Sequence, residues 1–244
     1  MAYTATQLVT ESYQIAQVNP RSLQTITGPE LASGLQWLNE IISIKSAKTR
    51  MIPYFTKYNF VAVPNQEAYF IPGLIQVETF TFNIGPIRFP TVNINRDVYF
   101  GAARADNISS LPFSWHLERA FVDGVEGANM YIYFKPDQTY PLEILAKFAL
   151  TQIPNELFDM TTAYTLYYIA YLKYALAQYI CTQYSMTMHP DAKEKYRELE
   201  RAIIDISPPD LTMQFTSAFG QVSAINFADA LLYTGYRPVG RSYG

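Results

Sequence analysis

The sequence predicts an α+β protein in which a helical bundle carries an inserted, β-rich domain with antiparallel strands and ends in an extended C-terminal arm. Two changes in hydrophobic period indicate this order. Apolar residues recur at helical spacing near the N-terminus, alternate through the middle of the chain, and return to helical spacing near residue 159. The predicted divisions are 1–55 for the first part of the bundle, 56–155 for the β-rich domain, 156–206 for the second part and 207–244 for the arm.

Two helices are predicted in residues 1–55. Residues Thr4 to Gln7 can cap a short helix whose apolar face includes Leu8, and Asn19-Pro20 would end it. The sequence Thr27-Gly28-Pro29-Glu30 predicts the start of a second helix, since proline suits the first helical turn. The core-facing stripe of this helix consists of Leu31, Leu35, Leu38, Ile41 and Ile42.

The block 56–155 shows the period of two that is typical of half-buried strands. Phe80, Phe82 and Ile84 alternate with polar residues, and the same pattern recurs at 130–134 and again near Ile144. Glycine-containing turn signals at 85–86 and 123–127 separate the strands. We therefore expect an antiparallel unit with short connections.

Residues 160–186 predict a long helix with a single charge, Lys173. A continuous helix of this length would extend for about 40 Å. Its central charge and many tyrosines argue against a membrane span, so we expect burial between neighbouring helices or neighbouring subunits. The helix predicted at 191–206 instead carries a solvated, charged face.

Composition restricts the function classes. A net charge of −3 and a pI near 5.4 disfavour a dedicated nucleic-acid binder, although DNA could still pass through a channel without adhering. The lone Cys181 excludes an intrachain disulfide and is expected to be a small buried residue. No signal peptide is visible at the start, so we expect folding in a reducing cytoplasm.

No residue pattern indicates catalysis. His116 and His189 are far apart in the sequence and are interpreted as structural. There is no phosphate-binding loop and no nucleophile elbow. The interleaved aromatic and basic residues at 96–104 are interpreted as a surface loop rather than a base-stacking site. The carboxylates that a glycoside hydrolase would need cannot be paired by spacing; they are Glu118, Asp123, Glu126 and Glu143. We therefore predict no enzyme activity, no cofactor and no metal.

The segment 207–244 combines many apolar residues with four charged ones. Disordered tails are usually charged and poor in aromatic residues, whereas this segment is apolar but has no sustained helical or strand period. It is therefore predicted to be an assembly arm that buries its apolar side chains on another chain.

Several short segments, in the same order, resemble the head-to-tail adaptors of short-tailed bacteriophages, which are also called tail accessory factors or head completion proteins. They are Thr25-Ile26-Thr27-Gly28-Pro29-Glu30, Gly34-Leu35-Gln36-Trp37-Leu38-Asn39, Met51-Ile52-Pro53-Tyr54-Phe55, Glu67-Ala68-Tyr69-Phe70-Ile71-Pro72-Gly73-Leu74, Tyr133-Phe134-Lys135-Pro136-Asp137, Tyr140-Pro141-Leu142, Tyr174-Ala175-Leu176-Ala177 and Pro208-Pro209-Asp210-Leu211. They span the chain to about residue 213, and none is a catalytic motif.

The resemblance implies an adaptor-like bundle and a structural role in the virion, at the neck or tail. Such a protein docks beneath the portal, typically as a ring of twelve copies. It extends the channel for double-stranded DNA without recognising sequence, offers a platform for the next tail component (a nozzle or tail tube), and does not enter a membrane. On this reading the portal-binding residues are Phe215, Phe219, Phe227, Leu231, Leu232 and Tyr233. The subunit interface would include Tyr164, Tyr167, Tyr171 and Tyr174.

Three other functions remain open from the sequence. The chain could be a neck or tail-tube ring protein that never contacts the portal. It could be a cell-wall hydrolase used at entry, for which Glu118 and Glu126 would be tested first. The block 56–155 could instead be a carbohydrate-binding module.

Overall fold

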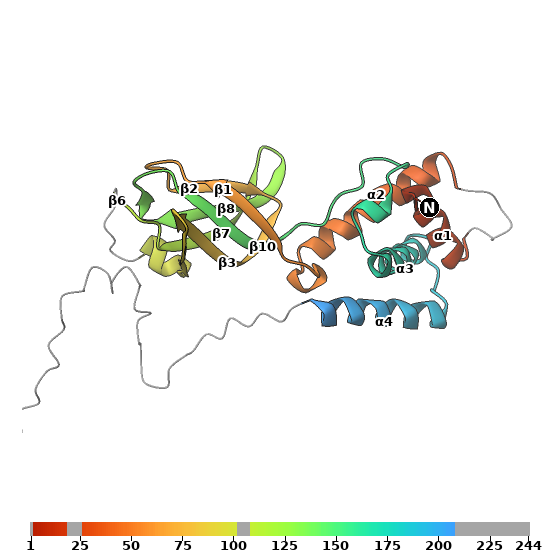
Figure 1. Ribbon diagram of the computed structural model, residues 1–244. Coiled ribbons are helices and arrows are strands. Elements are labelled where there is room, and N and C mark those ends of the chain that lie inside the picture. The colour runs from red at the N-terminus through yellow and green to blue at the C-terminus, as the bar shows by residue number, and fades with distance from the viewer. Residues whose placement is uncertain (1, 19–25, 102–107, 208–244) are drawn as a thin grey trace, which may run out of the picture. The chain divides into compact units, whose positions relative to one another are not determined.

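The structure is a computed structural model that describes residues 2–18, 26–101 and 108–207 (Figure 1). The described chain forms two compact units, a helical unit of residues 2–54 and 148–207 and a β unit of residues 55–147. The predicted α+β class, with antiparallel strands in the middle of the sequence, is confirmed. The segment predicted as the arm lies outside the described residues beyond Ser207.

The helical unit contains α-helices and short 3-10 helices. They are α1 (Ala5–Ile15), α2 (Pro29–Ser46), η1 (Thr49–Met51), η3 (Met160–Thr162), α3 (Leu166–Gln183) and α4 (Pro190–Ile206). The predicted start of α1 is confirmed, because the Thr4 hydroxyl accepts from the Gln7 amide and the Gln7 side chain accepts from the Thr4 amide. The predicted start of α2 at Pro29 is also confirmed, directly after Gly28 at a φ of 67°.

The prediction of one continuous helix over 160–186 is wrong. The Asp159 carboxylate accepts hydrogen bonds from the backbone and hydroxyl of Thr161, at 3.0 and 2.7 Å, and these bonds cap the separate turn η3. The same carboxylate oxygen accepts from the backbone N–H of Tyr3 at 3.2 Å. The helix α3 then begins at Leu166 and ends at Gln183, before Ser185 adopts a positive φ.

Helix α3 lies at the centre of the helical unit and packs against α1, α2 and α4. Its buried residues are Tyr168, Ile169, Tyr171, Leu172, Ala175, Leu176, Ala177, Ile180 and Cys181. Cys181 is therefore buried, as predicted. Among the described helices, none is long and apolar enough to cross a membrane. These buried residues of α3 belong to a core that is formed by the helices of its own chain.

The β unit consists of short strands in two four-stranded sheets and one small pair. The strands are β1 (Thr56–Val61), β2 (Ala68–Pro72), β3 (Leu74–Ile84), β4 (Ile87–Pro90), β5 (Val92–Asn93), β6 (Ser109–Ser110), β7 (Ser114–Val122), β8 (Val125–Tyr133), β9 (Lys135–Pro136) and β10 (Pro141–Phe148), with the π-helical turn η2 (Asp97–Gly101). The sheet orders are β1-β10-β3-β4 and β2-β8-β7-β5, with β6 beside β9.

The two larger sheets share one aromatic core. The Phe80 ring of β3 lies 6.2 Å from the Trp115 ring of β7, and the Phe82 ring lies 5.7 Å from the Phe113 ring. Phe80 and Phe82 are buried as predicted, but the predicted alternation is broken, because Thr81 between them is also buried and Ile84 is exposed. Ile84 is the last residue of its strand before the turn at Gly85, and it pairs with Ile87, which is also exposed.

The chain returns to the helical unit at residue 148, before the predicted boundary at 156. An amide clasp accounts for the difference. The Asn39 side chain accepts from the Ile153 backbone N–H at 2.9 Å and donates to the Ile153 carbonyl at 3.0 Å. The Leu150 amide also donates to the Ser46 hydroxyl at 3.0 Å. These contacts attach the returning segment to α2.

Gly34 marks the close crossing of α1 and α2. A Cβ atom at this position would lie 2.5 Å from Cγ1 of Val9, which is fully buried. Alanine should gain about 1 kcal/mol of helix propensity, but overpacking costs about 1–3 kcal/mol. We expect Gly34→Ala to lower the free energy of unfolding by about 1 kcal/mol in denaturant titrations followed by circular dichroism.

The double variant Gly34→Ala/Val9→Ala provides the control for this crossing. Removing the Val9 methyl groups makes room for the added Cβ, so the effect of Gly34→Ala should be smaller in the Val9→Ala background than in the wild type. Equal losses in both backgrounds would contradict a steric origin.

Candidate interaction surfaces

Tyr164 and Tyr171, two of the predicted subunit-interface residues, are buried within the helical unit itself. The Tyr164 hydroxyl donates to the Thr151 carbonyl. The Tyr171 ring lies 5.7 Å from the rings of both Tyr168 and Tyr196. Burial raises the pKa of Tyr164 and of Tyr171 well above the usual value. These two side chains therefore already have partners inside their own chain.

Tyr167 and Tyr174 are half-buried and keep part of their surface available. The Tyr167 hydroxyl lies 2.5 Å from that of Tyr54, whose side chain is exposed. A tyrosine that combines an apolar ring with a polar tip at the surface is typical of protein interfaces. A role for Tyr167 and Tyr174 in subunit contacts stays a prediction.

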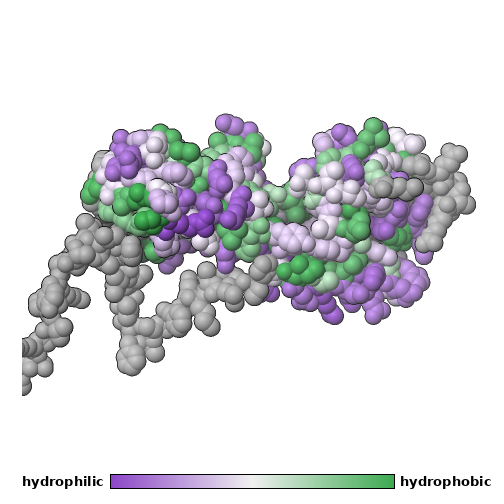
Figure 2. Space-filling model, in the orientation of Figure 1, coloured by the Kyte–Doolittle hydropathy of each residue, from purple (hydrophilic) through white to green (hydrophobic). Residues whose placement is uncertain are grey.

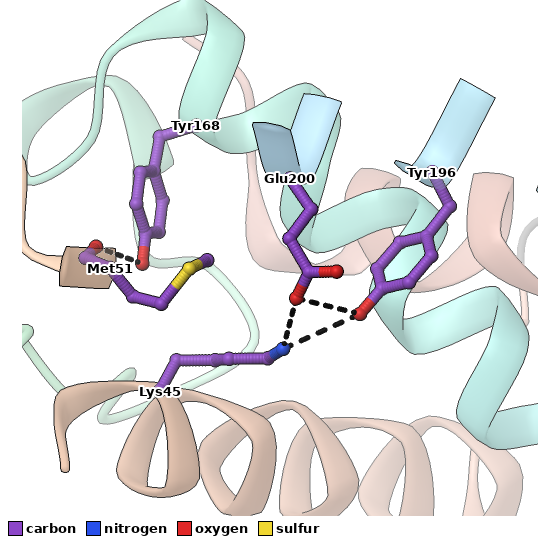
Figure 3. Close-up of polar contacts among 5 residues, drawn as sticks. All are labelled: Lys45, Met51, Tyr168, Tyr196 and Glu200. Carbon is purple, nitrogen blue, oxygen red and sulfur yellow. Dashed lines mark hydrogen bonds and ion pairs between the residues drawn. The ribbon is translucent and has the colours of Figure 1, made fainter. Parts of the chain in front are cut away.

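A polar cluster joins α2 to α4 (Figure 3). Lys45 Nζ lies 2.9 Å from a Glu200 carboxylate oxygen and 3.4 Å from the Tyr196 hydroxyl. The charged atom of Lys45 also lies 5.5 Å from the centre of the Tyr171 ring. Burial lowers the pKa of Lys45, but the hydrogen bond and charge of Glu200 outweigh it, so the pKa is raised. The cluster is therefore an ion pair that fixes α4 on the bundle.

Two further hydrogen bonds hold the segment that follows α2. The Tyr168 hydroxyl donates to the Met51 carbonyl at 3.1 Å (Figure 3), and the Ser207 hydroxyl donates to the Ile52 carbonyl at 3.3 Å. Ser207 directly follows α4 and is buried. The helical unit therefore fixes the position at which the predicted arm begins.

Apolar side chains are exposed at the end of the β7–β8 hairpin. Phe121 is 74% exposed, and Val122 and Val125, which pair with each other, are also exposed. Asp123 and Gly124 form the tight turn between them with φ angles of 50° and 80°. The turn predicted within 123–127 is therefore confirmed at Asp123-Gly124, whereas no sequence motif predicts that the adjacent apolar residues are exposed.

Of the exposed aliphatic side chains in the described helical unit, those of Leu157 and Leu166 have the largest exposed fractions. Leu157 and Leu166 are each 77% exposed, although both lie close in sequence to residues of the core. Single exposed leucines are common on protein surfaces, so neither alone identifies a binding site. Leu157, Leu166 and the half-buried Tyr167 are apolar side chains of this unit that remain accessible to another protein.

Glu118 and Glu126, the two candidate hydrolase carboxylates to be tested first, are not brought together as a pair. Glu118 lies opposite Asn129 and Glu126 lies opposite Phe121, so Glu118 and Glu126 project from opposite faces of the β7–β8 sheet. Glu118 forms an ion pair with Arg96 at 3.2 Å. Asp123 occupies the hairpin turn, and Glu143 pairs with Arg88 at 3.0 Å and with Lys57 at 3.4 Å.

The two histidines have structural surroundings. His116 is mostly buried, its Nδ1 lies 3.0 Å from the Ile94 carbonyl oxygen, and its ring stacks on that of Tyr99. His189 precedes α4 and lies 3.7 Å from Asp191. Within the described ranges, no group of histidine, cysteine and acidic residues could hold a metal ion.

Comparison of the chain with protein-family models and with curated proteins finds no match. The predicted portal-binding residues all lie outside the described residues; they are Phe215, Phe219, Phe227, Leu231, Leu232 and Tyr233. Arg104, from the interleaved aromatic and basic stretch, also lies outside them. The candidate surfaces of the described chain are thus the half-buried tyrosines of α3, the exposed Leu157 and Leu166, and the β7–β8 hairpin.

Proposed function

We propose that this chain is a structural virion protein, a head-to-tail adaptor that docks as a ring beneath the portal of a short-tailed bacteriophage. It extends the DNA channel and provides the platform for the next tail component. In this role the helical unit forms the ring, the β unit presents its hairpin surfaces, and residues 207–244 reach the portal. The proposal requires protein contacts and no catalytic step.

The observation that carries the proposal is the place of the resembling segments in the fold. Asn39, from one such segment, makes the amide clasp on Ile153. Met51, from another, accepts the hydrogen bond of Tyr168, and Tyr140 donates to Asp137 at 2.6 Å. These residues make long-range or turn-forming contacts, which help to define the fold. A resemblance at these positions therefore supports a fold shared with the head-to-tail adaptors.

The surface of the chain supports an assembly role. The β7–β8 hairpin presents Phe121 and its valine neighbours to solvent, where burial by another protein would be favourable. The helical unit fixes Ser207, and therefore the origin of the predicted arm, by a side-chain bond to Ile52. Because the start of the arm is held in place, the arm loses less conformational entropy when it binds another protein.

Deleting residues 211–244 is the test of the proposed docking. The deletion removes the six predicted anchors, and fully burying a large apolar side chain contributes about 1.5–3 kcal/mol. We expect the shortened chain to keep its circular dichroism spectrum and to lose co-sedimentation with the cognate portal. Electron microscopy of the full chain with portal should show a ring docked beneath it.

A full-length control separates the anchors from chain length. Replacing the six anchor residues by serine keeps all 244 residues and should also abolish portal docking. If the shortened chain or the serine variant docks like the wild type, the arm is not the portal-binding element. Rings that form without ever docking would instead favour a neck or tail-tube protein.

A further inference from the structure

Strand β1 has one edge that no other strand of the described chain covers. It stands at the end of the sheet order β1-β10-β3-β4 and pairs with β10 alone. The Ala62 amide, one residue beyond the strand, donates to the Tyr140 carbonyl at 2.8 Å. Hydrogen-bonded and non-hydrogen-bonded pairs alternate in an antiparallel ladder, so the backbone groups of Lys57, Asn59 and Val61, the edge residues of β1, point toward the free edge. Within the described ranges, no backbone group pairs with them on that side.

The core-facing side of β1 is only partly covered. Thr56, Tyr58 and Phe60 lie directly opposite three buried residues of β10, and residues so paired share one face of an antiparallel sheet. The three buried residues are Ala146, Ile144 and Leu142. Tyr58 is nevertheless 38% exposed, and Phe60 is half-buried. Hydrophobic side chains reach the surface of the β unit at several places (Figure 2), but at β1 the exposed surface continues a buried sheet face.

One segment of the predicted arm has the pattern of a strand that would fit this edge. It lies outside the described residues and alternates between apolar and polar side chains: Leu211-Thr212-Met213-Gln214-Phe215-Thr216. Such a run is typical of a strand with one buried face, and it contains no proline, glycine or charge. It has six residues, as β1 does. The open edge ends just after β1, because the Val63 amide donates to the Tyr69 hydroxyl at 2.9 Å.

The arm begins beside the chain that leads into β1. The Ser207 hydroxyl donates to the Ile52 carbonyl at 3.3 Å, and both residues have extended backbone angles. Leu211 follows Ser207 by four positions, and Thr56 follows Ile52 by four. The two prolines that come directly after Ser207 also favour an extended backbone. Two extended segments of equal length that start from one contact bring Leu211 level with Thr56 when they run side by side.

We propose that residues 211–216 add to the open edge of β1 as a parallel strand of the same chain, with Leu211 beside Thr56. Backbone hydrogen bonds hold an added strand, and its alternate side chains face opposite sides of the sheet. In this register the apolar residues 211, 213 and 215 continue the core face beyond Tyr58, and the polar residues between them lie on the outer face. A slip of one residue would reverse the two faces.

The occupant of the edge is the arm of the same chain rather than a second copy. Only three residues separate Leu211 from Ser207, so the effective concentration of residues 211–216 at the edge is far above that of another molecule. The strand forms before any partner is met and does not depend on the proposed function. Portal docking through Phe215, one of the predicted anchors, then requires the strand to leave β1.

Engineered disulfides test the register in the full-length chain. Asn59→Cys/Gln214→Cys places two thiols on directly opposite residues of strands about 4.8 Å apart, a separation that a disulfide tolerates. Under mild oxidation, its intrachain disulfide should form at least about tenfold faster than that of Asn59→Cys/Ser223→Cys, whose second thiol lies further along the same arm. The native Cys181 is buried and does not compete. Equal rates in the two variants would overturn the proposal.

Further cysteine variants test the direction of the strand and its origin. Val61→Cys/Thr216→Cys should cross-link readily, whereas Val61→Cys/Thr212→Cys, which an antiparallel strand would favour, should not. Chains that carry only Asn59→Cys should remain single, and so should their mixture with chains that carry only Gln214→Cys. A disulfide between two Asn59→Cys chains would assign the edge to β1 of a second copy. A disulfide between the mixed chains would assign it to the arm of another molecule. Either result sinks the proposal.

Amide hydrogen exchange in full-length variants tests the backbone pairing without added thiols. In the parallel register the Met213 amide donates to β1, whereas the Thr212 amide points away from it. Met213→Pro should therefore speed exchange at the three edge residues of β1 at least about tenfold, and Thr212→Pro should leave it close to the wild type. The β1 amides that bond to β10 should stay slow throughout and serve as the reference. Edge amides that exchange as fast in the wild type as in Met213→Pro would show that the edge is open.

Discussion

Raising the pH above about 10 is expected to unfold the helical unit. Burial raises the pKa of Tyr164, Tyr168 and Tyr171 above the usual value of about 10, and hydrogen bonding to Glu200 raises that of Lys45 despite its burial. The folded state therefore holds protons that the unfolded state loses in alkaline solution. The stability that these groups contribute is complete below their unfolded pKa values and disappears as the pH rises toward the folded ones.

The size of this effect follows from linkage. Each group that is protonated when folded and ionised when unfolded lowers the free energy of unfolding by about 1.4 kcal/mol per pH unit. Three tyrosines give about 4 kcal/mol per unit, and a typical domain has about 5–15 kcal/mol in total. We expect helical circular dichroism to collapse within about two pH units above 10, together with a cooperative rise in tyrosinate absorbance.

The tyrosine variants identify the groups responsible. Replacing Tyr171 or Tyr168 by phenylalanine removes one linked proton, so the dependence of the free energy of unfolding on pH should become shallower by about 1.4 kcal/mol per unit. The wild type, titrated in parallel, gives the reference slope. Ionisation of the buried tyrosines with full retention of helicity would contradict the argument.

Local signals in the sequence predicted the parts of the fold that depend on local chemistry. The cap at Thr4, the helix start at Pro29 and the strand with buried Phe80 and Phe82 each involve residues a few positions apart. The break between η3 and α3 could not be predicted this way. Asp159, which caps η3, also binds the backbone of Tyr3, a contact that spans 156 residues.

The candidate surfaces were harder to predict than the fold. The apolar surface of a tyrosine-rich helix must be buried. The spacing of its apolar residues, however, does not indicate whether the same chain or another chain buries it. Here Tyr164 and Tyr171 are covered by their own chain, whereas Tyr167 keeps exposed surface. The Lys45–Glu200 pair joins residues 155 positions apart, so no spacing rule could have connected them.

Removing the Glu200 carboxylate is expected to destabilise the helical unit markedly. The Lys45 side chain is 12% exposed and that of Glu200 is 29% exposed, so their contact is only partly screened by water. A hydrogen bond to a charged group contributes about 1.5–3 kcal/mol, and losing one partner leaves Lys45 partly buried without its counter-charge. We expect Glu200→Ala to lower the free energy of unfolding by about 2 kcal/mol in denaturant titrations.

A neighbouring pair on the same helix provides the control. Lys195 Nζ lies 2.8 Å from a Glu198 carboxylate oxygen, close to the 2.9 Å of the Lys45–Glu200 pair, but the Lys195 and Glu198 side chains are 47% and 66% exposed. Surface pairs of this kind contribute little, so Glu198→Ala should leave the unfolding midpoint unchanged within error. Equal losses in Glu200→Ala and Glu198→Ala would show that helix propensity or net charge, rather than the buried contact, determines the result.

The double variant Lys45→Met/Glu200→Ala separates the charge from the contact. Methionine keeps much of the apolar stem that Lys45 packs beside the Tyr171 and Tyr196 rings, and it removes the unpaired charge. The double variant should therefore be more stable than Glu200→Ala alone, because an apolar side chain is tolerated where an uncompensated ammonium group is not. If it is less stable, the packing of Lys45 against the rings, rather than its pairing with Glu200, holds α4 on the bundle.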